Sequence, residues 1–227
     1  MQKNLHLIDI NAIGKDYMDG GTAVRAIREM DFFIDDGEFV SIMGQSGSGK
    51  STLLSILGGL NQPSRGKVLV DTLDLYALSS EQRADFRSEY IGFIFQSFQL
   101  IPYLTVKENI KLPMAITSVK DREQEHRARS VLAKVGLDNK GDRLPDQLSG
   151  GEQERVAIAR AIVNDPPILL ADEPTGNLDT HTAGEVMALL TQLNRDGQTV
   201  IMVTHNPAMC AHSNRTIHIK DGVCLES

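Results

Sequence analysis

The chain has 227 residues, which is enough for one sizeable α/β domain or for a core with an inserted lobe. Its formal net charge of −7 at pH 7 argues against a nucleic-acid-binding protein, because such proteins usually present a basic face. Its two cysteines, Cys210 and Cys224, have neither the spacing of metal ligands nor that of a disulfide framework. We therefore expect reduced thiols in a cytosolic protein.

The sequence contains no apolar run that approaches the roughly 20 residues of a membrane-spanning helix. Its first ten residues also lack the long apolar core and the cleavage site of a secretory signal. We expect a chain that is soluble by itself and that reaches a membrane only through a partner.

Apolar periodicity and turn residues divide the first part of the chain into short elements. A polar, glycine-containing segment, residues 16–21, is predicted to be a loop that carries Tyr17. In chain order, the strands predicted here are 5–10, 24–34, 39–43, 67–70 and 91–95, and the helices are 50–57 and 80–87, the second capped by Ser79 or Ser80.

The rest of the chain begins with a polar, helical region and then alternates in the manner of a parallel sheet. We interpret the heavily charged helix predicted at 121–135 as a solvated helix of a small helical lobe. The predicted helices are 106–111, 121–135, 181–194, 207–211 and one that follows a glycine turn within 148–162, and the strands are 168–171, 199–204 and 216–220. This order predicts an α/β fold with a mixed N-terminal sheet, a parallel core and a helical insertion at about 98–164.

A glycine-rich loop with the pattern G-x-x-x-x-G-K-[ST] separates the strand at 39–43 from the helix at 50–57. In that setting the pattern is typical of a phosphate loop, whose N–H groups point at a polyanion beside the positive end of a helix dipole. Lys50 can reach the β- and γ-phosphates, and the Ser51 hydroxyl is placed to ligate Mg²⁺. A flexible Gly/Ser turn is the alternative, which the flanking strand and helix disfavour. The residues expected to bind nucleotide are Gly44, Gln45, Ser46, Gly47, Ser48, Gly49, Lys50, Ser51 and Thr52.

Two acids, Asp172 and Glu173, follow the apolar strand at 168–171. Phosphate-loop enzymes place such an aspartate beside Mg²⁺, directly or through water, so Asp172 is the predicted metal residue. Glu173 is then suited to orient and deprotonate an attacking water. Two acids at a strand end are common by themselves, but one nucleotide–Mg²⁺ site needs both these acids and the phosphate loop.

The segment 148–155, LSGGEQER, precedes a helix and resembles the signature motif of ATP-binding-cassette (ABC) ATPases. The resemblance runs from Tyr17 to His205, with the motifs in the family's order. Glu152 departs from the pattern, because many members have Gln there. Three further motifs match the family: Gln96 matches the Q-loop glutamine, residues 177–179 match the D-loop, and His205 matches the switch histidine. Within the family, the segments 56–60, 92–96 and 171–179 resemble the bacterial lipoprotein-releasing and macrolide-efflux type transporters.

The resemblance implies a role for each matched residue. Tyr17 would stack on adenine, Gln96 would sense Mg²⁺ and the attacking water, and His205 would hold the transition-state geometry near the γ-phosphate. The implied catalytic residues are Lys50, Gln96, Glu173 and His205, and the implied metal residues are Ser51, Gln96 and Asp172.

The resemblance also implies that the chain works in pairs. Ser149 and the N–H groups of Gly150 and Gly151, with the helix that follows them, form a second anion-binding end. In this family that end faces the γ-phosphate held by the other subunit. ATP would therefore join two chains in a two-fold homodimer with two composite sites, and hydrolysis would release them.

The implied fold is one ABC ATPase domain over residues 1–227, an α/β phosphate-loop NTPase. Its core sheet would be parallel and come from about 1–97 and 165–227, with an N-terminal antiparallel β-subdomain. The segment at about 98–164 would form an inserted α-helical subdomain.

The expected function is an ATPase, with ATP and Mg²⁺ as cofactors, that energises an ABC membrane complex. It would sit on the cytoplasmic face of a bacterial inner membrane against separate transmembrane permease subunits, and would touch neither the transported substrate nor nucleic acid. A nucleotide-gated scaffold or regulator of a cell-envelope complex that transports nothing is the alternative, because it would use the same ATPase. ABC ATPases of DNA repair or translation and small-molecule kinases are disfavoured, since the chain lacks a coiled-coil insertion and a second cassette and carries the signature motif.

Overall fold

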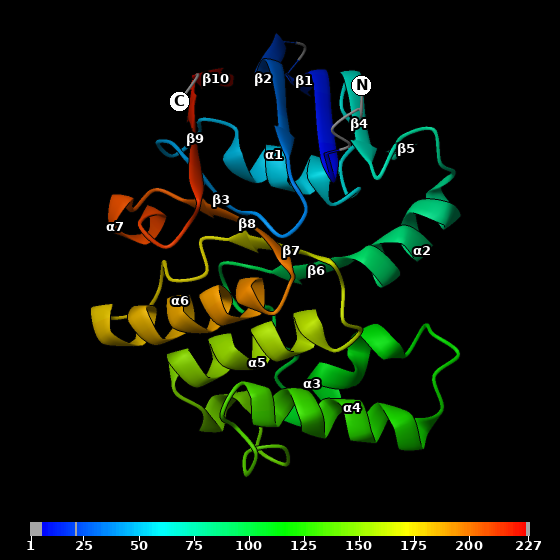
Figure 1. Ribbon diagram of the computed structural model, residues 1–227, viewed down its shortest axis with the longest axis vertical. Coiled ribbons are helices and arrows are strands. Elements are labelled where there is room, and N and C mark those ends of the chain that lie inside the picture. Colours follow the sequence, from blue (N-terminus) through cyan, green and yellow to red (C-terminus); the bar gives the residue numbers. More distant parts are fainter. Residues whose placement is uncertain (1–5, 21, 226–227) are drawn as a thin grey trace.

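The computed structural model describes residues 6–20 and 22–225 as one ten-stranded sheet with helices on both faces (Figure 1). The strand order across the sheet is β5-β4-β1-β2-β10-β9-β3-β8-β7-β6. The strands are β1 (Ile8–Asp19), β2 (Thr22–Ile34), β3 (Phe39–Met43), β4 (Arg65–Val70), β5 (Leu73–Asp74), β6 (Ile91–Ile94), β7 (Ile168–Asp172), β8 (Thr199–Thr204), β9 (Arg215–Lys220) and β10 (Val223–Leu225).

The helices begin and end close to the predicted positions. Three of them start with a capping box, in which a Ser or Thr side chain and a Glu or Gln side chain satisfy each other's backbone N–H groups: Ser79 caps α2, Thr105 caps α3 and Ser149 caps α5. The helices are α1 (Lys50–Leu57), α2 (Ser80–Tyr90), α3 (Val106–Lys111), α4 (Asp121–Lys134), α5 (Gly150–Ile162), α6 (Thr180–Arg195) and α7 (Pro207–Cys210).

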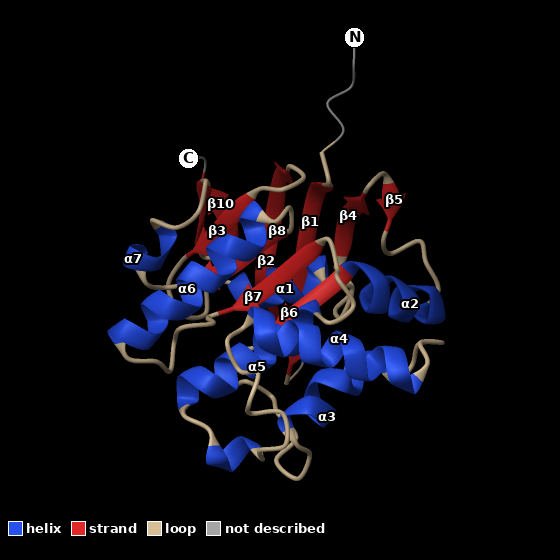
Figure 2. Ribbon diagram, turned by 60° about the horizontal axis from the view of Figure 1, so that its bottom comes forward, coloured by secondary structure: helices blue, strands red, loops and turns tan. Residues whose placement is uncertain are grey.

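The strands β6, β7, β8, β3 and β9 run parallel and form the centre of the fold. The strands β6, β7, β8 and β3 are mostly apolar, because helices cover both faces of a parallel sheet, whereas β9 alternates between apolar and polar residues. On β7, Ile168 and Leu170 join the core that contains α1, whereas Leu169 and Ala171 join the core that contains α5 and α6. Figure 2 shows the sheet between these two helical layers.

The N-terminal strands β2, β1, β4 and β5 pair antiparallel. The prediction that Tyr17 lies in a loop is wrong: it lies in β1, opposite Val24 of β2. The register of this pair shifts three times between Ile10 and Asp16, and Ala12 has a left-handed φ of 46°. These irregularities break the alternation of side chains and hide the strand from a periodicity argument. Leu5, where the first strand was predicted to start, lies outside the described residues.

The residues at about 98–164 contribute α3, α4 and α5, which pack against one another below the sheet (Figure 1). On α4, Ala128 and Leu132 are buried and Arg122 and Arg129 are exposed, so the predicted solvated helix with a narrow apolar face is confirmed. Among the described residues, no helix is both long and apolar enough to span a bilayer.

Strand β10 was not predicted. It pairs antiparallel with β9 and parallel with β2, where Val223 lies opposite Glu29. Three residues are too few for a periodicity signal. This short strand joins the antiparallel part of the sheet to the parallel part.

Candidate functional site

The phosphate loop runs from the end of β3 to the start of α1 and rests on two other strands. Gly47 and Gly49 have left-handed φ values of 77° and 100°, which favour glycine. A Cβ on Gly49 would lie 2.4 Å from the Ala26 carbonyl oxygen of β2, and one on Gly44 would lie 2.3 Å from the Ile219 carbonyl oxygen of β9. Glycine is therefore required both for the curl of the loop and for its close approach to the sheet.

The first turn of α1 offers unpaired donors to an anion. Its N-cap, Gly49, supplies no side-chain hydrogen bond, and the turn contains no acidic residue. Backbone N–H groups at such an end are satisfied by a ligand or by water, and the helix dipole favours a negative one. Lys50 is buried beside them, and its Nζ donates to the Gln45 carbonyl oxygen over 2.9 Å.

An open cavity of about 960 Å³ lies over this loop. Gln96, Glu173 and His205 come from the ends of β6, β7 and β8 and reach the same cavity, as expected where the carboxyl ends of parallel strands meet. Its wall also includes residues that no motif indicated, because they come from β2 and from the end of β9: Ala26, His218, Ile219, Lys220 and Asp221.

Two carboxylates, those of Asp172 and Glu173, make three contacts with neighbouring side chains at the edge of the cavity. The Ser51 hydroxyl donates to Asp172 Oδ1 over 3.1 Å. Glu173 Oε2 lies 2.9 Å from His205 Nδ1 and accepts a hydrogen bond from Gln96 Nε2 over 3.4 Å. The predicted set Lys50, Ser51, Gln96, Asp172, Glu173 and His205 is thus brought together in one place.

Glu173 holds its position with a strained backbone. Its φ of 47° is left-handed, an arrangement that persists in a non-glycine residue only where the surroundings enforce it. Its N–H donates to the Val203 carbonyl oxygen of β8 over 2.9 Å, which anchors it to the neighbouring strand. Beside it, burial raises the pKa of Asp172, and the charge of Glu173 adds to the effect, while the hydrogen bond from Ser51 and the charge of Lys50 oppose it.

The donor set fits Mg²⁺. Ser51 Oγ and Asp172 Oδ1 are hard oxygen ligands that lie next to each other, and Mg²⁺ is usually held by one or two protein oxygens together with phosphate and water. Within residues 6–20 and 22–225 there is no group of three or more His, Cys, Asp or Glu that could hold a metal by themselves.

The signature residues lie elsewhere. Ser149 and Gly150 are exposed at the start of α5, and neither they nor Gly151 line the phosphate-loop cavity. Glu152 has a structural role: its carboxylate accepts from the Ser149 N–H over 2.9 Å and pairs with Lys140 at 3.3 Å. The hydrogen bond to the Ser149 backbone holds the pKa of Glu152 below its usual range.

Tyr17 is also absent from the lining of the cavity. Its ring is 39% exposed, the Lys15 ammonium lies 5.0 Å from its centroid, and its hydroxyl accepts a hydrogen bond from Asn61 Nδ2. Its contact with adenine stays a prediction.

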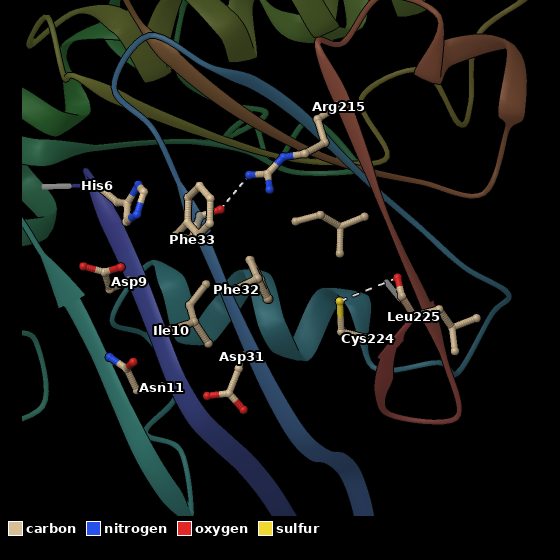
Figure 3. A pocket seen from close by; sticks show the side chains of 11 residues that line it. His6, Asp9, Ile10, Asn11, Asp31, Phe32, Phe33, Arg215, Cys224 and Leu225 are labelled. Carbon is tan, nitrogen blue, oxygen red and sulfur yellow. Dashed lines mark hydrogen bonds between the residues drawn. The ribbon is translucent and has the colours of Figure 1, made fainter. Parts of the chain in front are cut away.

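A second cavity of about 510 Å³ opens between β1, β2 and the β9–β10 pair (Figure 3). Three of its polar side chains already have partners: His6 contacts Asp35, Asp31 accepts from the Ala12 N–H, and Arg215 donates to Glu38 and to the Phe33 carbonyl oxygen. We interpret this cavity as a structural feature of the sheet, because these bonds connect the strands that flank it.

The comparisons with known proteins show the family of this chain. Residues 27–176 match the family model described as ABC transporter. An ABC transporter ATP-binding protein of Thermotoga maritima is 47% identical over 98% of this chain and 94% of its own length. The macrolide export ATP-binding/permease protein MacB of Chlorobium phaeobacteroides is 46% identical over 99% of this chain, which spans only 34% of that longer protein.

A solved structure described as the dimeric, post-hydrolysis state of the ATP-binding cassette MJ0796 bound to ADP and Pi is 42% identical. It superimposes with a TM-score of 0.89 over 96% of this chain and 97% of that one. The chain therefore belongs to the ABC transporter family, as an ATP-binding domain with the ABC ATPase fold. The predicted likeness to macrolide-efflux proteins is confirmed.

Proposed function

We propose that the protein hydrolyses ATP in an Mg²⁺-dependent manner and drives a conformational change in a separate transmembrane partner. The observation that carries this proposal is the cluster at the phosphate-loop cavity, in which Glu173 contacts Gln96 and His205 while Asp172 contacts Ser51. The catalysed reaction is ATP + H₂O to ADP and phosphate.

The position of each residue at the phosphate-loop cavity determines its proposed role. The phosphate-loop N–H groups and Lys50 bind the phosphates and neutralise charge that builds up on them. Glu173 accepts the proton of the attacking water. His205 and Gln96 contact the Glu173 carboxylate and orient that carboxylate. Ser51 and Asp172, with Gln96 nearby, would hold Mg²⁺, which supplies Lewis-acid charge to the phosphate oxygens.

The active form is a homodimer joined by ATP. Ser149 and Gly150 are exposed at the start of α5, and neither they nor Gly151 line the cavity of their own chain. A second chain can bring its γ-phosphate to this helix end, which would complete two composite sites by two-fold symmetry. The dimeric MJ0796 cassette with bound ADP and Pi supports this arrangement.

The membrane partner is expected to dock in an apolar groove of about 320 Å³ beside β6. Leu60, Phe95 and Ile116 line it and are exposed, with exposed fractions of 53%, 36% and 78%. An apolar groove between helices fits the apolar face of one further helix. MacB joins an ATP-binding part to a permease in one chain, so we infer that a cytoplasmic helix of a permease occupies the groove. The ATPase would then sit on the cytoplasmic face of the membrane, away from the transported substrate.

The test is ATP turnover by the purified chain and by Glu173→Gln. Loss of the carboxylate base should lower kcat by about 100-fold or more, while ATP binding persists. Glu185→Gln is the matched control, because Glu185 is a half-exposed carboxylate on α6 that pairs with Arg155. Equal turnover by Glu173→Gln and the wild type would show that the assignment of the base is wrong.

A further inference from the structure

The segment that follows Gln96 is strained. Phe98 and Gln99 are consecutive non-glycine residues with left-handed φ values of 59° and 52°. The Gln99 N–H donates to the Ser97 carbonyl oxygen over 2.5 Å, which closes a tight three-residue turn. A left-handed backbone is strained in a non-glycine residue, so such a turn persists only where other groups hold it.

Arg160 on α5 holds this turn. Its Nη1 donates to the Gln99 carbonyl oxygen over 2.5 Å and its Nη2 to the Phe98 carbonyl oxygen over 2.6 Å. A planar guanidinium can grip two acceptors at once, which an ammonium cannot do in a fixed geometry. Among the described residues, no ion pair within 4 Å involves Arg160. The hydrogen bonds of its guanidinium therefore go to the two carbonyl oxygens of the turn.

The held turn fixes Gln96 beside the proposed catalytic base. Gln96 Nε2 donates to Glu173 Oε2 over 3.4 Å, and the Gln96 carbonyl oxygen accepts from Asn177 Nδ2 over 3.0 Å. Asn177 thus fixes the backbone of Gln96. The turn that Arg160 binds fixes the backbone directly after Gln96. A shift of the turn would change the reach of the Gln96 amide.

Arg160 also faces the groove proposed for the membrane partner. It lines that groove together with Phe95, which directly precedes Gln96, and Ile116. One side chain therefore contacts both the groove and the turn. A helix that enters the groove meets Arg160 and Phe95 before it can influence the nucleotide site.

We propose that Arg160 is a positioning residue for hydrolysis: it holds the 97–99 turn so that Gln96 reaches Glu173, and it makes that geometry responsive to what occupies the groove. This inference rests on the proposed function, because the contact between Gln96 and Glu173 matters only if the chain hydrolyses ATP. Arg160 itself does not line the nucleotide cavity.

The test compares ATP kinetics of the wild type, Arg160→Met, Arg160→Lys and Arg83→Met. Arg160→Met should lower kcat by about 10- to 100-fold, since misplacement of a reacting group by about 1 Å can have that effect. Its KM for ATP should stay within about twofold of the wild type, because the phosphate loop is untouched. Arg160→Lys should give an intermediate kcat, because an ammonium keeps the charge but cannot donate to both carbonyl oxygens in a fixed geometry.

Arg83→Met is the matched control. Arg83 Nη1 donates to the Leu78 carbonyl oxygen over 2.6 Å, a bond of the same kind made by a residue that does not line the nucleotide cavity. Its loss should lower the unfolding temperature without lowering kcat when all variants are assayed below their unfolding temperatures. An unchanged kcat in Arg160→Met, or an equal loss in Arg83→Met, would overturn the inference.

A crystal structure of Arg160→Met without nucleotide gives a readout independent of turnover. We expect the 97–99 turn to leave the left-handed region and Gln96 Nε2 to move beyond hydrogen-bond distance of Glu173 Oε2. An unchanged turn would refute the role of Arg160 even if kcat falls. If the wild type hydrolyses no ATP, or if Glu173→Gln is fully active, the proposed function fails instead, and the crystal structure still decides whether Arg160 holds the turn.

Discussion

Glu154 on α5 is completely buried, and neither of its carboxylate oxygens has a hydrogen-bond partner among the described residues. Burial raises its pKa to about 8, and the charge of Arg160 opposes the shift. The folded chain therefore keeps a proton on Glu154 at neutral pH, whereas the unfolded chain releases it near the ordinary pKa of a glutamate. Since the folded state binds more protons between these two values, this group makes the free energy of unfolding fall as pH rises from about 4.5 to about 8.

Replacement of this carboxyl by an amide should remove that pH dependence. Glu154→Gln is expected to raise the free energy of unfolding by about 1–3 kcal/mol at pH 8.5, and to change it little at about pH 4.5, where the loss begins, because only the ionised carboxylate is strongly penalised by burial. Urea unfolding at the two pH values measures the difference. Glu185→Gln, at a half-exposed site, should show no such contrast. An equal effect of Glu154→Gln at both pH values would contradict a buried, neutral carboxyl.

At the scale of single elements, α2 illustrates how local chemistry fixes a helix boundary. The sequence allows either Ser79 or Ser80 as the cap. In the structure Ser79 is the N-cap, with an extended backbone, and Gln82 completes the capping box. Ser80 is the first helical residue and supplies no cap.

This assignment can be tested by two neighbouring substitutions. Ser79→Ala should lower the free energy of unfolding by about 1 kcal/mol, because it leaves a backbone N–H of the first turn without its acceptor. Ser80→Ala should leave stability nearly unchanged, since Ala is a good helix former. Urea unfolding of the two variants gives the comparison, and a larger loss for Ser80→Ala would place the cap one residue later.

Elements with a strong local signal were predictable from the sequence, and those defined by distant pairing were not. The helices α1 and α3 and the strand β8 match their predicted bounds, because an apolar pattern and a turn or cap mark each end. The prediction ends the first strand at residue 10, although β1 continues to Asp19, because bulges interrupt the alternation of its side chains. The strand β10 exists through pairing with β9 and β2, which lie apart in the sequence.

The candidate site was predictable to a similar degree. The phosphate loop and the pair Asp172–Glu173 have fixed spacing that the chemistry demands, and the structure brings them to one cavity. The wall formed by Ala26 and Lys220 was missed, because backbone approach and cavity shape leave no residue pattern. The role of Arg160 was missed for the same reason: an arginine in an amphipathic helix gives no indication of which carbonyls it will reach.

At the scale of the whole molecule, the proposed dimer can be tested through Ser149. Aspartate is as good an N-cap as serine, so Ser149→Asp should keep α5 intact while it places a negative charge where the partner's γ-phosphate would bind. In the Glu173→Gln background with ATP, we expect a dimer by light scattering, and we expect Ser149→Asp to abolish it. Like charges in such an interface are strongly unfavourable.

Ser149→Asn is the control for this experiment, because it keeps a capping side chain without the charge. It should retain the ATP-dependent dimer, at least in part. If Ser149→Asp dimerises as readily as Ser149→Asn, the start of α5 does not face a phosphate, and the composite site must be abandoned.

The close packing of the phosphate loop on β2 and β9 has a consequence for how the protein is made. Gly44 lies against the Ile219 carbonyl oxygen, Gly49 lies against that of Ala26, and the Gly222 N–H donates to the Ser48 carbonyl oxygen over 3.2 Å. The loop is thus supported by backbone that is synthesised more than 160 residues after it. We infer that a nascent chain gains its affinity for nucleotide only when β9 and the turn after it have left the ribosome. Nucleotide binding by a stalled chain that ends near residue 200 would contradict this order of events.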